Sequence, residues 1–310
     1  MMSTPSMAIK SHQVGRLLIG GGYKLNSGFE IPMIGMGCSR NIEKLDESVE
    51  AALKCGYRLF DTARIYNNED ILGASLKKHM TALSIPREDI FITTKVPITN
   101  DSAAESVDKY IEESLAKLQV SYLDLVLVHY PRDRDTGIDE AKEINELNRR
   151  LVYQKLEHYC DKGIIRSIGV SNYEVLHLFE LFKYCRIPPA VNQIEYHPYC
   201  TKPQVVDVCR TNNIFVQAYS SLCWGNKDIL QEDIVVKLSE KYNVPPQIVL
   251  LRFGVSSGVG IIPKSATPSH IEQNLCATAQ LSFVPQELDE LKKLDRNQQF
   301  CPNCYPWRVL

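Results

Sequence analysis

Gly56-Tyr57-Arg58-Leu59-Phe60-Asp61-Thr62-Ala63-Arg64-Ile65-Tyr66 is a short apolar strand pattern that ends on a carboxylate, with a tyrosine five residues after it. Two later strand-like runs end in the same way, because residues 90–94 lead to Lys95 and residues 123–128 lead to His129. Asp61, Lys95 and His129 follow one another at intervals of 34 residues. That interval is about the length of one strand-helix-strand unit, so consecutive parallel strands would bring these side chains to one end of a sheet. We therefore expect an acid, a phenol, an amine and an imidazole to converge there.

Strand patterns alternate with helical patterns along most of the chain, and amphipathic segments such as 102–118 and 230–242 predict helices. Eight repeats favour a closed (β/α)8 TIM barrel, an α/β fold, over an open doubly wound sheet. Ahead of the barrel, residues 17–19 and 31–34 flank the turn residues Asn26-Ser27-Gly28 and predict an N-terminal β-hairpin. The expected strands are 33–37, 58–61, 90–95, 123–129, 165–171, 191–196, 215–220 and 260–264.

The bulk properties narrow the class of protein. Barrels of 310 residues commonly form one domain, so we expect a single domain over 1–310, with a polar arm at 1–16 and a tail at 296–310. A net charge of −2 gives no basic surface for nucleic acid or an anionic membrane. The chain shows neither a leader pattern nor an apolar run of about 18 residues. A cytoplasmic monomer that acts on a small molecule is expected.

The ten cysteines are scattered, and several lie inside apolar patterns, so most should be buried free thiols. Cys301-Pro302-Asn303-Cys304 is the exception, because a Cys-x-x-Cys pair can serve in redox chemistry or as half of a zinc site. No second pair completes a metal site in the sequence. We therefore expect no metal.

The four converging groups have a chemical meaning together. An ammonium beside a phenol favours the phenolate and lowers the pKa of the phenol, while a carboxylate keeps the lysine charged and in place. An imidazole nearby can hold a carbonyl oxygen. Each residue alone has an ordinary structural explanation as a cap, a solvated charge or a core histidine. Independent caps need not end three consecutive strands, so we interpret the group as proton-donating machinery; His158, His177 and His197 lack such partners in the sequence and are interpreted as structural.

A bound nucleotide would need a phosphate site, and the sequence lacks the Rossmann type. No strand pattern is followed by Gly-x-Gly-x-x-Gly, since Gly20-Gly21-Gly22 lies in the predicted hairpin. The last barrel strand instead ends in Lys264-Ser265, just before a helix that begins near Thr267-Pro268. An ammonium, a hydroxyl and helix N-terminal amides together suit an anion.

The sequence resembles the aldo-keto reductases, which are NAD(P)H-dependent carbonyl reductases built on a (β/α)8 barrel. Residues 56–63 with Glu69-Asp70-Ile71-Leu72-Gly73 are similar to the first signature of that family, residues 164–173 to the second, and residues 261–267 to the start of the third. The resemblance covers roughly residues 17 to 295. It implies a reductase that transfers a hydride from NADPH, with NADH possible, to an aldehyde or ketone. The catalytic residues it implies are Asp61, Tyr66, Lys95 and His129.

The resemblance also implies further contacts. Ser171, Asn172 and Gln193 would bind the nicotinamide amide, and Tyr219 would stack on the ring. Ser220 and Leu222 would lie along the pyrophosphate, and Gln273 and Asn274 would face the adenine. For Asn192 and Gln193, a buried strand network stays an alternative. The other implied cofactor contacts are Gly37, Cys38, Asp61, Lys264, Ser265, Thr267 and His270; the implied substrate contacts are Ser39, Tyr66, His129, Tyr130, Trp224 and Trp307.

The sequence departs from the family at three places. NADPH-preferring members carry an arginine where this chain has His270, and a histidine grips phosphate less firmly than a guanidinium. Ser39 and Tyr130 stand in a region where many relatives have tryptophans. The charged loop 131–135 is expected to be short and to leave that side of the site open. Two other functions stay open: a cofactor-binding regulatory or structural barrel, and a thiol-redox or metal-binding protein that uses Cys301 and Cys304.

Overall fold

The computed structural model describes residues 18–99, 103–132 and 142–301. Eight parallel strands form one sheet, and a separate antiparallel pair precedes it. The strands are β1 Gly22–Lys24, β2 Glu30–Pro32, β3 Met36–Gly37, β4 Leu59–Asp61, β5 Phe91–Val96, β6 Leu123–Val128, β7 Ile165–Ser171, β8 Val191–Glu195, β9 Phe215–Tyr219 and β10 Gly260–Ile261. The α-helices are α1 Leu45–Cys55, α2 Glu69–Ala82, α3 Ala103–Leu118, α4 Lys142–Asp161, α5 Val175–Phe182, α6 Pro203–Thr211, α7 Lys227–Leu230, α8 Asp233–Tyr242, α9 Pro246–Ser256, α10 Pro268–Gln280 and α11 Pro285–Lys292.

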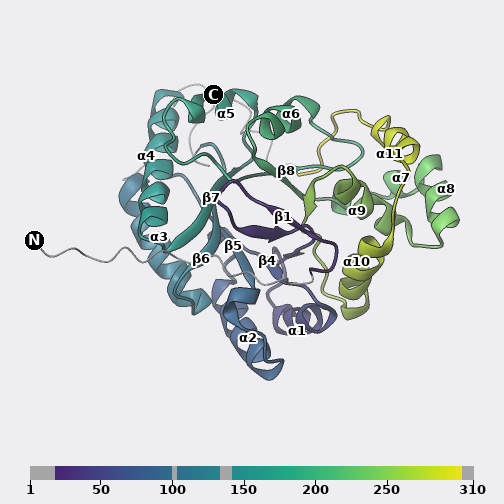
Figure 1. Ribbon diagram of the computed structural model, residues 1–310, viewed down its shortest axis with the longest axis horizontal. Helices are drawn as coiled ribbons and strands as arrows, with labels where there is room; N and C mark the ends of the chain where they lie inside the picture. The colour runs from purple at the N-terminus through teal and green to yellow at the C-terminus, as the bar shows by residue number, and fades with distance from the viewer. Residues whose placement is uncertain (1–17, 100–102, 133–141, 302–310) are drawn as a thin grey trace, which may run out of the picture.

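The parallel sheet closes on itself. Its order runs from β3 to β10 in chain sequence, and a parallel bridge between Ile34 and Ile261 joins the last strand to the chain just before the first. Gly35 N donates to Ile261 O at 2.8 Å, and Ile261 N donates to Met33 O at 2.8 Å. Helices surround the strands on the outside (Figure 1). The predicted (β/α)8 barrel is confirmed.

The hairpin of β1 and β2 covers the amino ends of the strands and lies across the ring of strands in Figure 1. Its turn is the predicted one, because Gly28 adopts a positive φ of 89° and donates to Leu25 O at 2.9 Å. Leu25 and Ile31 are buried in a small apolar cluster inside the barrel, which also includes Leu59, Phe91, Leu125, Leu127 and Phe215. This end of the barrel is therefore closed by apolar packing.

The expected first strand of the hairpin is wrong. The strand is β1 (Gly22–Lys24), and residues 18 and 19 are not in a strand, while residue 17 lies outside the described residues. Ile19 packs instead against the large core between the strands and the helices, near Gly56 and Leu275. The apolar character of this stretch thus reflects contact with helices and not strand pairing.

One other expectation needs correction. The predicted helix over 230–242 is divided into α7 and α8, because Glu232 has extended backbone angles and its carboxylate accepts hydrogen bonds from Tyr199 and Arg296. The expectation of a short, open loop at 131–135 stays a prediction, because residues 133–135 lie outside the described residues. Arg132 in this loop is buried despite its charge. Within the described residues, every helix lacks the length or the apolar character that a membrane crossing requires.

Candidate active site

The carboxyl ends of β4, β5 and β6 bring the predicted catalytic residues together. Lys95 Nζ donates to Asp61 Oδ1 at 2.5 Å and to the main-chain oxygen of Thr62 at 2.9 Å. Tyr66 ends the 3-10 turn η1 (Arg64–Tyr66) that follows β4, and its ring centroid lies 5.2 Å from Lys95 Nζ. The His129 ring stands edge-on to the Tyr66 ring at 5.9 Å between centroids. The four side chains that the sequence analysis expected to meet form one cluster.

The ion pair at the centre of this cluster is enclosed by protein. Lys95 is 1% exposed and Asp61 is 2% exposed. Burial lowers the pKa of Lys95, and the negative charge of Asp61 and its hydrogen bond oppose that shift. An ammonium with little water around it acts strongly on its neighbours, because the local dielectric is low. The phenol of Tyr66 is the neighbour whose ionisation this charge favours.

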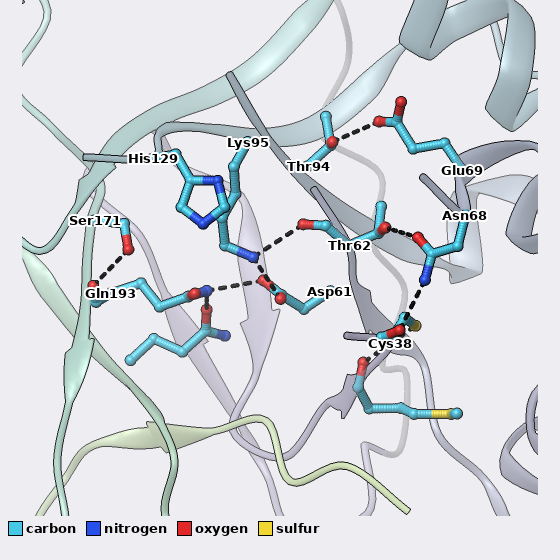
Figure 2. A network of polar contacts seen from close by, with 12 residues as sticks. Cys38, Asp61, Thr62, Asn68, Glu69, Thr94, Lys95, His129, Ser171 and Gln193 are labelled. Atoms are coloured by element: carbon cyan, nitrogen blue, oxygen red, sulfur yellow. Dashed lines mark hydrogen bonds and ion pairs between the residues drawn. The ribbon is translucent and has the colours of Figure 1, made fainter. Parts of the chain in front are cut away.

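The second oxygen of Asp61 is held from the opposite side of the barrel. Gln193 Nε2 donates to Asp61 Oδ2 at 2.8 Å and lies 2.8 Å from Gln217 Oε1. Figure 2 shows Lys95 between Asp61 and Thr62, with Gln193 reaching Asp61 from β8. Gln193 therefore couples the catalytic cluster to β8, and Gln217 extends the chain of contacts to β9.

The residues expected near the nicotinamide are also joined to one another. Ser171 Oγ donates to Gln193 O at 2.8 Å, and Asn172 Nδ2 donates to His129 O at 2.9 Å. The hydroxyl of Tyr219 donates to Asn172 Oδ1 at 2.6 Å. These bonds connect the carboxyl ends of β6, β7, β8 and β9 beside the tetrad. The result is a polar surface with amide and hydroxyl groups, the kind that binds a planar carboxamide.

A cavity of about 220 Å³ lies beyond this surface, at the end of β10 and the start of α10. Thr267 N-caps α10, and Thr267 N donates to Ser265 Oγ at 3.1 Å. The ammonium of Lys264 and the helix N-terminus give this cavity an affinity for anions. Its lining consists of Leu222, Pro245, Gln247, Ile248, Lys264, Ser265, His270, Gln273 and Asn274. Six of these nine are residues that the sequence analysis assigned to the cofactor, and Thr267 stands next to them.

The expected substrate residues lie around the mouth of the barrel, except one. Tyr130 stacks on His129 with 4.5 Å between ring centroids, and Ser39 follows β3 in a half-buried position. Trp224 is 49% exposed, donates from Nε1 to Ser220 Oγ at 2.8 Å, and packs under the guanidinium of Arg40 at 4.5 Å. Trp307 lies outside the described residues.

Gly37 and Cys38 sit on the wall of the mouth between β3 and β10. A Cβ atom on Gly37 would lie 2.7 Å from Ile262 O and 3.7 Å from Lys264 Cβ, so the strands approach closely here only because the residue is glycine. Cys38 is fully buried, and its main-chain oxygen accepts from Asn68 Nδ2 at 2.7 Å. Burial raises the pKa of the Cys38 thiol far above its ordinary range. The thiol is therefore part of the core beneath the site.

A second cavity, of about 630 Å³, lies between the N-termini of α5 and α6 and residues 295–297. None of the predicted site residues lines it. Its charged side chains are already paired, since Lys202 bonds Glu174 at 2.5 Å and Arg296 bonds Glu232 at 2.8 Å. We therefore place the chemistry at the tetrad, where the polar groups converge, and not in this larger space.

The cysteines in the described residues are free thiols, and those residues contain no group of histidine, cysteine and carboxylate side chains arranged to hold a metal ion. Cys301 is half-buried near the end of the described chain, and Cys304 lies outside the described residues.

Several residues that build the site are not among those predicted from the sequence. Gln217, Thr62 and Arg40 contact the predicted residues, and Glu195 is a buried carboxylate two positions after Gln193. Alternation along a strand offered a signal for Glu195, because residues two apart share a face. The others depend on which loops and strands become neighbours, which local patterns do not reveal.

The fold and the site define a barrel oxidoreductase, and the comparison with known proteins names its family. The model of the aldo/keto reductase family matches residues 35–296. The chain belongs to this family, and it is an enzyme that reduces carbonyl groups with a nicotinamide cofactor, NADPH.

Its relatives cover almost the whole chain. It is 36% identical over 282 residues to the glyoxal reductase of Bacillus subtilis, an alignment with 90% of this chain and 95% of that protein. It is 35% identical to the methylglyoxal reductase DkgA of Yersinia pestis, with 90% and 95% covered. Among solved structures, an aldo-keto reductase of Bombyx mori in complex with NADP superposes with a TM-score of 0.81 at 28% identity, with 90% and 94% covered.

Proposed function

We propose that Tyr66 is the acid that protonates the carbonyl oxygen of the substrate, with Lys95, Asp61 and His129 in supporting roles. The convergence of a half-buried phenol on a buried ammonium is the observation that carries this assignment. Asp61 and Thr62 fix the ammonium by hydrogen bonds. The imidazole of His129, next to the phenol, orients the carbonyl oxygen.

The reaction needs a hydride and a proton. NADPH, when bound, supplies the hydride, a hydrogen with two electrons, to the carbonyl carbon. The π bond breaks toward oxygen, which takes the proton of the Tyr66 hydroxyl, and the product is an alcohol. The ammonium of Lys95 stabilises the phenolate that remains until water returns the proton. Nothing in this scheme requires a nucleophile from the protein.

Residues that line the two polar regions suit the two ends of the cofactor. We assign the nicotinamide to Ser171, Asn172, Gln193 and Tyr219, and the adenosine phosphate to the cavity with Lys264, Ser265 and His270. We assign the pyrophosphate to Ser220 and to Leu222, which lines the same cavity, and the absence of a side chain on Gly37 lets the strands approach closely beside it. Lys264 is the cation placed to favour the 2′-phosphate of NADPH over the hydroxyl of NADH.

The substrate class is small reactive aldehydes and ketones. The relatives named glyoxal reductase and methylglyoxal reductase support dicarbonyl compounds as the first substrates to test. Ser39 and Tyr130 at the mouth are less bulky than tryptophan and leave room for larger carbonyl compounds as well. A comparison of methylglyoxal with an aromatic aldehyde in NADPH oxidation measures the preference.

The assignment of Tyr66 is tested by Tyr66→Phe. We expect turnover to fall on the order of a hundredfold or more, because the only proposed proton donor is removed. NADPH should still bind, since the phenol is not among the cofactor contacts, and intrinsic fluorescence measures that binding. Unchanged turnover in this variant would remove Tyr66 from its role. A wild-type chain that binds NADPH but reduces no carbonyl would support the alternative of a regulatory cofactor-binding barrel.

We also propose a single-domain monomer in the cytoplasm. The free thiols among the described residues support a reducing compartment. Light scattering after size exclusion measures the oligomeric state, and a mass of two chains would contradict the monomer.

A further inference from the structure

Glu195 is a carboxylate with no exposed surface at the carboxyl end of β8. Its Oε1 accepts from Phe300 N at 2.7 Å, and its Oε2 accepts from Cys301 N at 3.2 Å. His197 Nε2 lies 3.1 Å from the same Oε1. A buried carboxylate is costly unless hydrogen bonds compensate it, and here two consecutive main-chain amides of the C-terminal segment supply them.

The position of Glu195 relates this contact to the active site. Side chains two residues apart in a strand point to the same face, so Glu195 shares the inner face of the barrel with Gln193. Gln193 contacts Asp61 of the tetrad. Glu195 is one layer nearer the carboxyl ends of the strands, where the barrel opens, and its register partner is Tyr219 of β9. The two amides that it binds therefore lie at the mouth above the tetrad.

Residues 296–301 form a strap that runs to this point from the outer rim. Arg296 N and Gln298 N both donate to Tyr199 O, at 3.2 and 2.9 Å. The Phe300 ring then packs on His197 at 5.4 Å and on Tyr199 at 6.3 Å between centroids. The rim end is also held by the ion pair of Arg296 with Glu232, which is partly exposed, whereas the carboxylate at the mouth has no exposed surface. The inner end of the strap is thus fixed by charge-assisted hydrogen bonds that are shielded from solvent.

We propose that Glu195 is a positioning residue for carbonyl reduction, because it holds residues 300 and 301 as one wall of the substrate pocket. This inference rests on the proposed function only in that Tyr66 and His129 mark where the carbonyl binds. Tyr219 is the neighbour of Glu195 in β9, but the hydrogen bonds of the Glu195 carboxylate go to the strap and to His197, and not to the reacting atoms or to a proposed cofactor contact. Its loss should affect substrate binding more than the chemical step or the cofactor.

The chain offers a matched control in Glu157. Its carboxylate is also buried, and its Oε1 accepts from two consecutive main-chain amides, Arg186 N at 2.6 Å and Ile187 N at 2.7 Å. Residues 186–187 precede β8, so this contact lies at the amino end of the strands, opposite the mouth. Glu157→Gln neutralises the same kind of buried charge-assisted contact without changing the pocket, although its amide oxygen can still accept from both main-chain amides.

The experiment compares Glu195→Gln with Glu157→Gln in the full chain. A glutamine places an NH₂ group against a main-chain donor, so one of the two bonds at the strap is lost. For Glu195→Gln we expect the KM for an aromatic aldehyde to rise about tenfold, the scale of a lost hydrogen bond to a charged group. The dissociation constant of NADPH should stay within about twofold, because the cofactor contacts are intact. Glu157→Gln should change stability alone.

Hydrogen exchange at Phe300 and Cys301 gives a readout that does not depend on activity. Both amides should exchange faster in Glu195→Gln than in the wild type, and Glu157→Gln should leave them unchanged. If both amides exchange as slowly as in the wild type, Glu195 does not hold residues 300 and 301. If they exchange faster but the KM is unchanged, these residues do not form a wall of the substrate pocket. If Tyr66→Phe retains full turnover, the proposed function fails while the exchange measurement still tests the anchor. Should Glu195→Gln not fold, Glu195→Asp moves the charge back by one methylene and should raise the KM in the same way.

Discussion

At the residue scale, the site depends on the positive charge of Lys95, which is buried in surroundings that disfavour the charged form. Desolvation lowers the pKa of Lys95, and Asp61 opposes this effect through its charge and its hydrogen bond. The buried pair costs free energy that a hydrophobic pair would not, so it is better explained by chemistry than by stability. In the proposed mechanism, the pair keeps a cation beside the phenol at neutral pH.

The opposing effects of burial and of Asp61 on the pKa of Lys95 predict how kcat depends on pH in the variant Asp61→Asn. Without the carboxylate, only desolvation and weaker contacts act on Lys95, so its pKa falls further. The lysine then loses its proton at a lower pH than in the wild type. We expect the alkaline decline of kcat to move to lower pH in the variant, measured as a pH profile of NADPH oxidation with saturating aldehyde. An unchanged alkaline limb would show that Asp61 does not maintain the charge of Lys95.

The tetrad could be predicted from the sequence, and some of its partners could not. Asp61, Lys95 and His129 each end an apolar run, and the regular interval between them indicates a shared sheet edge. Gln217 and Arg40 contact the site through neighbours that closure of the barrel brings together. Alternation places Glu195 on the same face of β8 as Gln193, but its bond to the C-terminal segment could not be predicted from the sequence.

At the element scale, the contact between β3 and β10 joins barrel closure to the cofactor cavity. Gly37 of β3 faces Ile262 O and Lys264, and the main-chain bond from Gly37 N to Pro263 O at 3.1 Å holds the two together. Lys264 lines the cavity at the start of α10. The position of the predicted phosphate-binding cation therefore depends on how closely two strands approach.

Gly37→Ala tests this dependence. Its methyl group would lie 2.7 Å from a main-chain oxygen, which cannot move without shifting the end of β10. We expect a loss of about 1–3 kcal/mol in the free energy of unfolding, the cost of an overpacked contact, together with weaker NADPH binding. Chemical denaturation and fluorescence titration measure the two effects.

Gly35→Ala is the matched control for this prediction. Its methyl group would meet the side chain of Leu59 at 2.4 Å, in the apolar interior at the amino end of the barrel. That variant should lose stability and keep the affinity for NADPH. Equal loss of affinity in both variants would contradict a special role for the contact of Gly37 with Ile262 and Lys264.

Strand endings are predicted better than the segments between them. The period of apolar residues identifies the eight barrel strands, because buried parallel strands are apolar on both faces. The same apolarity misleads at residues 17–19, where Ile19 packs on helices without pairing. The break between α7 and α8 is also hidden, because it depends on Glu232 bonding to Tyr199 and Arg296, which are distant in sequence.

At the scale of the whole molecule, the two ends of the barrel have different tasks. Apolar side chains and the hairpin fill the amino end, whereas charged and polar groups occupy the carboxyl end. The eight alternating strand and helix patterns in the sequence predict a barrel, and barrels of this kind carry their active sites at the carboxyl ends of the strands. The strap of residues 296–301 could not be predicted in this way, because its sequence has no helical or strand periodicity that distinguishes it from an ordinary tail.

The preference for NADPH over NADH depends on residues at the ends of several strands. It can be measured through the thermal stability of the whole chain with each cofactor. A ligand that binds only the folded state stabilises it, by about 2.7 kcal/mol at a concentration about 100 times its dissociation constant. NADPH and NADH differ by the 2′-phosphate, which we assign to Lys264, Ser265 and His270. At equal concentrations NADPH should therefore raise the melting temperature more than NADH does.

Lys264→Ala should remove that difference, since the ammonium is the always-charged group in the cavity lining. His270→Arg should enlarge it by about 1–3 kcal/mol of binding free energy, the scale of a charge-assisted hydrogen bond. The guanidinium carries a permanent charge and two parallel donors, and the imidazole offers neither at neutral pH. The shifts in melting temperature with each cofactor, in wild type and both variants, measure the effect. A preference for NADPH that survives in Lys264→Ala would place the 2′-phosphate elsewhere, because no other residue that lines this cavity carries a permanent positive charge.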